Sequence, residues 1–395
     1  MTQRRPRTPP DDRPPPALPP GGGLLLVDKP SGCTSHDVVG RLRRVLRTRR
    51  IGHAGTLDPM ATGLLVLAVD RSTKLLGHLA LTDKTYLATI RLGQQTDTDD
   101  ADGVVVATRS VDGVTEVDIL AGIAGLTGPL MQVPSSVSAI KVQGRRAYDL
   151  VRSGETVELA ARPVTVSRFE ILAGPRVVTV SATVSDSGTP ANPSQPAEPN
   201  QPADPDSPGH PETPADPGQP ADPIQSSDPI QPADPGHPGG AGVPHSPSPT
   251  AGDPVTVVDL DVVVDCTTGT YIRSLARDLG AVLGVGGHLT RLRRTRVGPF
   301  TVDDAVDVYG TDAQISAAFA DEIAGRVIPA SSAVQLAFPT RTVGAEEVEH
   351  LRHGRPIPAA GIAGTYGVLD ESGSLVALVS ETGSTARSVL GWLTG

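Results

Sequence analysis

The chain has 395 residues, with 34 basic and 44 acidic side chains and only two cysteines. Two cysteines exclude a disulfide framework and a cysteine-based metal site, while the length allows two or three domains. The longest apolar run near the N-terminus, LLLV at 24–27, is too short to cross a membrane, and no signal peptide is recognisable, so we expect a cytoplasmic protein.

The first predicted elements are a disordered tail, a strand and a helix. Residues 1–21 are rich in proline and charge, which favours disorder. The apolar stretch GLLLVDK at 23–29 predicts a strand. In SHDVVGRLRRVLRTRR at 35–50, apolar residues recur with helical spacing and arginines occupy the opposite face. We therefore expect a helix here, with Ser35 as its N-cap.

The next segment, GHAGTLDPMATG at 52–63, places one carboxylate, Asp58, among small and apolar residues. Asp-Pro between glycines is good turn chemistry, so a tight turn is one interpretation. A glycine-lined loop that lets a ligand approach a carboxylate closely is the other. The loop alone leaves both interpretations open.

Several strands follow, and a long insertion interrupts them. Strands are predicted from β-branched and apolar runs at 63–69, 85–93, 162–172, 177–184 and 255–266. Between the last two, proline recurs at every third position from Pro190 to Pro223, which is the polyproline II period and excludes helix and sheet. Residues 186–253 therefore predict a disordered, Pro-rich insertion that replaces a hairpin turn inside one domain, 22–185 and 254–335.

The insertion also explains the net charge of −10, because it holds ten acidic residues and no Lys or Arg. In the neutral remainder, basic residues gather in two clusters. Six arginines and no acidic residue lie between Val38 and Leu57, and HLTRLRRTR occupies 288–296. Such clusters fit a polyanionic partner, although solvated faces without a ligand are the alternative.

A second helix and a small C-terminal module complete the layout. TGTYIRSLARDLGAVLG at 268–284 predicts a helix whose apolar stripe runs from Ile272 to Val282 and Leu283. Arg273 in its first turn opposes the helix dipole, which indicates a carboxylate nearby. Residues 336–395 predict a short helix at 345–354 and alternating strands joined by the turn DESG at 370–373, that is, a separate β-rich domain.

Four separated segments closely resemble the TruB family of tRNA pseudouridine synthases, in the order of that family. They are LLLVDKPSGCTSHDVV, RRIGHAGTLDPMATGLLVLAV, KTYLATIRLGQQTDTDDADG and CTTGTYIRSLARDLG with GGHLTRLRRTRVGPF. VPSSVSAIKVQGRRAYDLVRSG is similar to the family segment between the third and the fourth. The resemblance covers 22–185 and 254–300 and is weaker beyond. It implies an α+β fold: a mixed, largely antiparallel sheet with flanking helices, plus a C-terminal PUA-like domain.

The resemblance, to the bacterial type of this family, also implies an activity. The substrate would be tRNA, and the uridine at position 55 of the TΨC arm would become pseudouridine through base flipping. No metal, nucleotide or redox cofactor would be needed, and the enzyme would act as a monomer without a membrane or an obligatory protein partner. A non-catalytic tRNA-folding chaperone that uses the same surface is the alternative, and folding activity could also accompany catalysis.

By the same resemblance, Asp58 matches the catalytic aspartate, Arg273 the arginine that pairs with it, and Tyr86 the residue that stacks on the flipped uracil. Three features would be needed for this chemistry: a nucleophile, a counter-charge that keeps it ionised, and a stacking face. The remaining substrate-binding matches are His53, which inserts where the base has left, Tyr271, Leu292, Lys29 and Pro30.

Phosphate contacts are expected from both basic clusters, because cations position RNA without reading its sequence. The arginines concerned are Arg43, Arg44, Arg47, Arg49, Arg50, Arg291, Arg293 and Arg294. In the PUA-like domain, by contrast, acidic residues outnumber basic ones. RNA contact and packing against the catalytic domain are therefore both open roles for that domain.

Overall fold

The computed structural model describes residues 14–80, 82–135, 159–181, 254–309 and 315–392, and the backbone at 141–142 and 145–146. All described residues belong to one compact unit. Most of the predicted disordered tail and the whole insertion, 186–253, lie outside the described residues. Residues 14–22 form no helix or strand, but Leu18 packs against a buried apolar cluster, so the ordered chain begins before residue 22.

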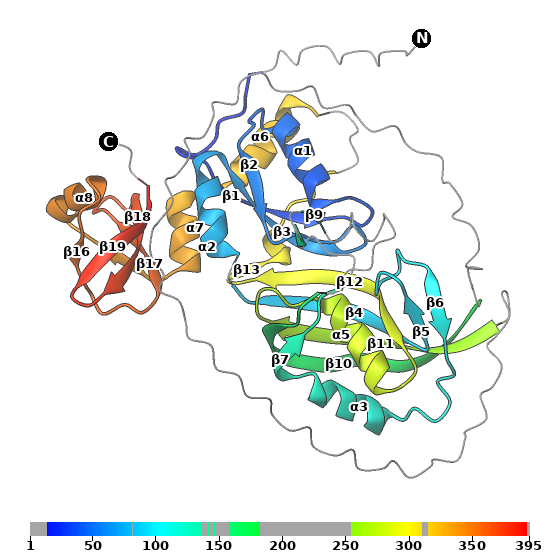
Figure 1. Ribbon diagram of the computed structural model, residues 1–395. Helices are drawn as coiled ribbons and strands as arrows, with labels where there is room; N and C mark the ends of the chain where they lie inside the picture. The colour runs from blue at the N-terminus through cyan, green and yellow to red at the C-terminus, as the bar shows by residue number, and fades with distance from the viewer. Residues whose placement is uncertain are drawn as a thin grey trace. The chain divides into compact units, whose positions relative to one another are not determined.

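The largest element among the described residues is a ten-stranded sheet with the order β14-β1-β3-β12-β4-β11-β10-β7, to which β2 and β13 are added at β3 and β12 (Figure 1). Its strands are β1 (Gly23–Lys29), β2 (Ile51–Ala54), β3 (Thr62–Val69), β4 (Lys84–Leu92), β7 (Gly128–Gln132), β10 (Arg162–Ser181), β11 (Pro254–Cys266), β12 (Gly287–Val297), β13 (Phe300–Thr301) and β14 (Ile328–Pro329). Two short hairpins are β5 (Gln94–Thr96) with β6 (Val105–Thr108), and β8 (Lys141–Val142) with β9 (Arg145–Arg146). The predicted strands are confirmed where the structure describes them, except that those at 162–172 and 177–184 form one continuous strand, β10. The sheet is mixed but largely antiparallel, as expected.

The sheet consists of two halves that meet between β3 and β12. These two strands run parallel and share only two residue pairs, Arg293 with Thr62 and Arg294 with Gly63. On the other side, β12 pairs with β4 over its whole length. One apolar cluster covers the half with β4 and β11, and a different cluster covers the half with β1 and β3. We call the two-pair junction between β3 and β12 the seam.

Helices cover both halves. They are α1 (Ser35–Val45), α2 (Leu76–Leu79), α3 (Glu116–Gly125), α5 (Ile272–Val282), α6 (Ala317–Gly325) and α7 (Ala330–Ala337), with short 3-10 turns η1 (Asp70–Leu75) and η2 (Val302–Asp304). A further helix, α8 (Ala345–Arg352), packs on the C-terminal strands. Apolar residues of α3 and α5 pack on β4 and β11, whereas those of α1 and α6 pack on β1 and β3 (Figure 1). None of the described helices is long and apolar enough to cross a membrane.

Both predicted helices of the catalytic domain are present, with two corrections. The N-cap of α1 is Thr34, not Ser35, because the Thr34 side chain and Asp37 form a reciprocal capping box. In α5, Val282 is 65% exposed, because it lies at the end of the helix where the core no longer covers it, so it is not part of the buried stripe.

The insertion does replace a hairpin turn. Strands β10 and β11 pair antiparallel, and Ser181 is opposite Pro254 at the end of the ladder. The predicted strand residues 182–184 lie outside the described part of the chain. Two strands that are separated by about seventy residues therefore meet as if a short turn joined them.

The C-terminal domain is a five-stranded sheet with the order β15-β17-β18-β19-β16. Its strands are β15 (Thr340–Thr342), β16 (Ile357–Pro358), β17 (Thr365–Leu369), β18 (Leu375–Thr382) and β19 (Thr385–Gly391). Leu378 and Trp392 belong to the same apolar cluster as Leu24 and Val66 of the catalytic domain, and the Arg71 guanidinium lies over the Trp392 ring at 5.2 Å. A shared apolar cluster supports the packing role for this domain.

Candidate active site

The loop that carries Asp58 connects β2 to β3 and is fixed by buried polar groups. Ser35 exchanges hydrogen bonds with the backbone of Leu57, at 3.0 and 3.2 Å. On the other side of Asp58, the Lys29 ammonium donates to the Pro59 carbonyl at 3.2 Å. A turn closes the loop, because the Ala61 amide donates to the Asp58 carbonyl at 3.1 Å. The loop is thus both a tight turn and a rigid support for one carboxylate.

Arg273, at the start of α5, binds the Asp58 carboxylate through two nitrogen atoms. Its Nε lies 3.0 Å from Oδ2 of Asp58, and its Nη2 donates to Oδ1 at 3.3 Å. The arginine is buried, whereas the Asp58 side chain remains 37% exposed. A bidentate pair of this kind fixes orientation as well as charge. The predicted pairing is confirmed, and it explains a cation in the first turn of a helix.

A second carboxylate, Asp100, holds the far side of the same guanidinium. Its Oδ2 lies 3.3 Å from Nη1 of Arg273, which also donates to the Thr98 carbonyl at 2.9 Å. Asp100 is itself fixed by the Thr98 hydroxyl and the Asp102 amide. Sequence reasoning missed Asp100, because the polar run TDTDD at 96–100 has the composition of an ordinary surface turn.

Opposing effects act on the pKa of Asp58. Burial raises this pKa above its ordinary value, the neighbouring Arg273 charge works in the opposite direction, and Asp100 raises the pKa further. The net direction is upward, so the ion pair does not fully offset burial. Asp58 is consequently a carboxylate that is poorly solvated and more basic than an ordinary aspartate.

Six predicted site residues line one cavity of about 280 Å³: Asp58, Arg273, Tyr86, Tyr271, Leu292 and Arg294. They come from the loop after β2, from β4, from the start of α5 and from β12, so both sides of the seam contribute. The buried Gln132 side chain accepts from the Tyr271 amide at 2.8 Å and donates to its carbonyl at 3.1 Å. Gln132 thereby fixes the backbone at the N-terminus of α5, which the sequence did not indicate.

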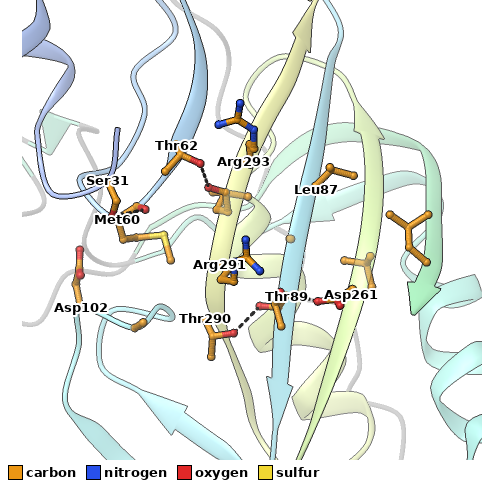
Figure 2. A pocket seen from close by; sticks show the side chains of 15 residues that line it. Ser31, Met60, Thr62, Leu87, Thr89, Asp102, Asp261, Thr290, Arg291 and Arg293 are labelled. Carbon is orange, nitrogen blue, oxygen red and sulfur yellow. Dashed lines mark hydrogen bonds between the residues drawn. The ribbon is translucent and has the colours of Figure 1, made fainter. Parts of the chain in front are cut away.

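A larger cavity of about 480 Å³ lies next to it, lined by Met60, Thr62, Arg291 and Arg293 among others, with Leu292 common to both. Figure 2 shows Ser31, Met60 and Asp102 on one side of this cavity, and Arg291, Thr89 and Asp261 along the strands on the other. Asp261 is paired with Arg176 and the Thr89 hydroxyl, but no aromatic side chain is among the described residues that line this larger cavity. The smaller cavity combines a carboxylate held by a buried arginine with the rings of Tyr86 and Tyr271, and it is the candidate active site.

Two further substrate-binding predictions concern the first motif. Lys29 is fully buried and donates to the carbonyls of Pro30, Cys33 and Pro59. It therefore cannot touch a substrate directly, which corrects the prediction: a long cation next to a strand end looks exposed in sequence, but here it supports the Asp58 loop. Pro30 is exposed.

His53 lies on β2, outside the cavity that contains Asp58. Its ring lies edge-on to that of His36, with the ring centres 6.4 Å apart. Burial lowers the pKa of His53 below the ordinary histidine value, and its Nδ1 atom is buried without a hydrogen-bond partner among the described residues. The ring is thus neutral near pH 7 and half-buried at the surface of the sheet.

The predicted phosphate-binding arginines differ in accessibility. Arg43, Arg44, Arg47, Arg49, Arg50 and Arg291 are exposed. Arg293 is half-buried and binds Asp28 through two hydrogen bonds of 3.0 and 2.7 Å. Arg294 is only 1% exposed and donates to main-chain carbonyls, so it is not placed to bind a phosphate on the surface. The reason for this correction is that successive side chains of a strand point to opposite faces of the sheet, which is not apparent from a run of basic residues in the sequence.

Comparisons with known proteins identify the family of the chain. The model of the TruB family pseudouridylate synthase N-terminal domain matches residues 43–189, and two C-terminal models of tRNA pseudouridine synthase II and B match 338–392 and 273–335. A tRNA pseudouridine synthase B of Mycobacteroides abscessus is 44% identical over 93% of this chain and 95% of its own length. One of Nocardia farcinica is 45% identical over 93% and 92%.

Among solved structures, a chain from a Cbf5-Nop10-Gar1 complex is similar with a TM-score of 0.55 and 20% identity, over 94% of this chain and 85% of that one. A chain of an H/ACA RNP bound to a substrate RNA gives a TM-score of 0.53 at 20% identity, with the same coverage. These structures support the fold. The identity to the curated relatives over nearly the whole chain, together with the matched family models, shows that the chain belongs to the TruB family of pseudouridine synthases.

Proposed function

We propose that this protein converts the uridine at position 55 of the TΨC arm of tRNA to pseudouridine, with Asp58 as the nucleophile. One observation carries the proposal: an accessible carboxylate, Asp58, is held bidentately by the buried Arg273 in a cavity that also contains Tyr86. The choice of tRNA follows the names of the curated relatives, which are tRNA pseudouridine synthases.

The chemistry is an isomerisation and needs no co-reactant. The Asp58 carboxylate attacks C1′ of the target ribose and forms an ester as the bond between C1′ and N1 of the uracil breaks, with the electron pair left on N1. The base turns within the cavity, C5 attacks C1′ and displaces the carboxylate, C5 then loses its proton to solvent, and N1 takes up a proton. The raised pKa of Asp58 favours this role, because a carboxylate that is poorly solvated is a stronger nucleophile and base.

The target base must first leave its stack, at a cost of a few kcal/mol. The Tyr86 ring lines the cavity beside Asp58, and stacking on an aromatic ring recovers about 1–3 kcal/mol per base. Tyr271 and Leu292 form the remaining walls that face the nucleotide. His53, neutral and half-buried outside the cavity, would fill the space that the flipped base leaves.

The exposed arginines of α1 and the loop after it, with Arg291, would hold the phosphates around the target. Opening the tRNA to reach the base also gives the protein a tRNA-folding activity. We propose that it works as a cytoplasmic monomer without a cofactor. The C-terminal domain contributes mainly by packing, since its apolar contact with the catalytic domain is extensive and its charge is acidic.

The test is to incubate the protein with an unmodified tRNA transcript and to map pseudouridine at single-nucleotide resolution. We expect conversion at position 55 and nowhere else in the transcript. Conversion at another position would overturn the site assignment, and binding without any conversion would favour the chaperone alternative. A transcript with cytidine at position 55 is the control, and it should bind but remain unmodified.

A further inference from the structure

Arg294 of β12 is among the largest fully buried side chains of the protein, with 1% exposure. Burying a charge is costly unless it is well paired. Within the described part of the chain no carboxylate forms a salt bridge with it. Instead its Nε donates to the Leu64 carbonyl at 2.8 Å, and its Nη2 donates to the Gly55 carbonyl at 2.9 Å. A cation held in the interior by main-chain carbonyls needs an explanation other than RNA binding.

The two carbonyls that Arg294 binds belong to the two ends of the loop that carries Asp58. Gly55 directly follows β2, and Leu64 lies near the start of β3. A planar guanidinium presents its donors in a rigid fork, so one side chain fixes the separation of the two loop ends. The loop therefore has a defined span at its base, in addition to its contacts with Ser35 and Lys29.

The backbone around Arg294 is packed just as closely. Its Cα is paired with Gly63 across the seam and with Tyr86 on β4. Gly63 has a φ of +100°, and a Cβ there would lie 2.2 Å from the Arg294 carbonyl oxygen. Only glycine allows this approach. Arg294 thus lies where the loop of Asp58, the strand of Tyr86 and the seam meet.

We propose that Arg294 is a positioning residue for the reaction: it sets the place of the Asp58 loop relative to Arg273 and Tyr86, which lie across the seam. The proposal rests on the proposed function, because it assumes that Asp58 reacts. Arg294 also lines the cavity that contains Asp58 and Tyr86, but its Nε and Nη2 are engaged by the two loop-end carbonyls. Its neighbour Lys84 lies beside Gly55, but its ammonium donates to the carbonyls of Ala80 and Thr82 instead.

Arg294→Met is the direct test, because methionine fills part of the space without donating a hydrogen bond. We expect kcat at saturating tRNA to fall about 100-fold while the Kd for tRNA changes less than threefold. Arg294→Lys keeps the charge but not the fork, and kcat should fall about tenfold. Two variants serve as matched controls. Arg291→Met, on the same strand, should weaken tRNA binding instead. Arg326→Met, at an exposed arginine directly after α6, should leave both constants unchanged.

Two measurements distinguish a positioning role of Arg294 from a purely structural one. Rates are expressed per folded molecule, with the folded fraction taken from thermal melts and circular dichroism. The pH profile is the second readout: Arg273 lowers the pKa of Asp58, so a displaced loop should move the acid limb of kcat to higher pH in both variants. Addition of guanidinium to Arg294→Met should partly restore kcat, whereas the same concentration of NaCl should not.

The proposal is overturned if folded Arg294→Met keeps kcat within threefold of the parent, if its loss is confined to Kd, or if its acid limb does not move. Failure of the proposed function looks different: the parent protein would then form no pseudouridine at position 55, or Asp58→Asn would remain active. Parent and Asp58→Asn are therefore measured in the same series.

Discussion

The two arginine-rich segments of the chain look alike in sequence but do different work. In residues 43–50 the arginines lie on a helix and the loop after it, and all five are exposed. In residues 291–296 they lie on β12, where Arg294 is buried at the seam, Arg293 is bound to Asp28, and Arg296 donates to the Thr85 hydroxyl at 2.8 Å. Of that second group, only Arg291 is fully exposed. The first segment is therefore suited to RNA, and the second mainly holds the catalytic domain together.

The difference shows that the number of basic residues in a segment predicts RNA binding only when the secondary structure of that segment is known. A helix can keep several cations on one solvent face, whereas a strand between two neighbours turns alternate residues to opposite faces. We therefore expect turnover, tRNA affinity and fold stability to respond to substitutions at different residues, and each of these quantities can be measured separately.

The largest effect is expected for Asp58→Asn, which removes charge from the reacting group but hardly changes its shape. Pseudouridine formation should be abolished, while the Kd for tRNA should stay within about tenfold, or about 1.4 kcal/mol, because the exposed arginines are unchanged. Turnover is measured by pseudouridine mapping and affinity by titration. Substantial turnover by a verified Asp58→Asn protein would remove Asp58 from the mechanism.

Arg273→Lys should cost about 100-fold in kcat. The guanidinium binds Asp58 through two nitrogens and Asp100 through a third, and an ammonium cannot reproduce that planar fork. The affinity for tRNA should change little, since Arg273 is buried. A lysine variant with the parental kcat would show that any cation suffices, and the bidentate geometry would then be irrelevant.

Charge reversal of Arg43, Arg44 and Arg47 should act on binding alone. Each phosphate contact that is lost flattens the slope of log K against log salt by about 0.7–0.9, so a total change of about two to three is expected, with kcat at saturation preserved. Arg293→Met is the matched change in the other segment, and it should leave the salt slope as it is. Equal slopes for both variants would show that the two arginine-rich segments contribute alike to RNA binding.

The smallest functional effect is expected for removal of the acidic insertion. Replacing residues 182–253 by an Asn-Gly turn should preserve turnover, because Ser181 and Pro254 are already paired. Closing a shorter loop costs less entropy, about 0.6 kcal/mol per halving of its length, so stability should rise by up to about 3 kcal/mol. Binding of tRNA should be equal or slightly tighter at low salt, with the gain lost as salt screens the ten acidic charges. A large loss of turnover in the well-folded variant would instead place the insertion in the active machinery.

Much of the fold and the centre of the site could be predicted from sequence, because their signals are local. Apolar runs predicted β1, β3, β4, β10 and β11, and the resemblance of GTLDP, KTY and GTYIR to family motifs identified Asp58, Tyr86 and Arg273. The capping box of Thr34 and Asp37 was also readable, as a threonine followed by an acid three residues later, although the neighbouring serine concealed it.

What could not be predicted depends on contacts between distant segments. Strand β12 has a β-bulge between Leu289 and Arg291, and its apolar residues do not alternate regularly, so it looks like a basic cluster and not like a strand. Three features of the site follow from the pairing of strands across the sheet: Arg294 is buried, Asp100 binds Arg273, and Gln132 fixes the backbone of Tyr271. In the sequence alone, Arg294, Asp100 and Gln132 cannot be distinguished from polar residues on the surface.

The narrow seam has a consequence for cooperativity. Asp58 follows β2 in the half of the sheet with β1 and β3, whereas Tyr86 and Arg273 belong to the half with β4 and α5. Local opening of a protein follows its least stable contacts, and only two residue pairs join these halves in the sheet. Leu57 and Ala61, on either side of Asp58, nevertheless pack in the apolar cluster of Tyr86 and Ile272. Opening at that junction would therefore expose apolar surface around the loop, so catalysis and the packing of the loop should be lost together.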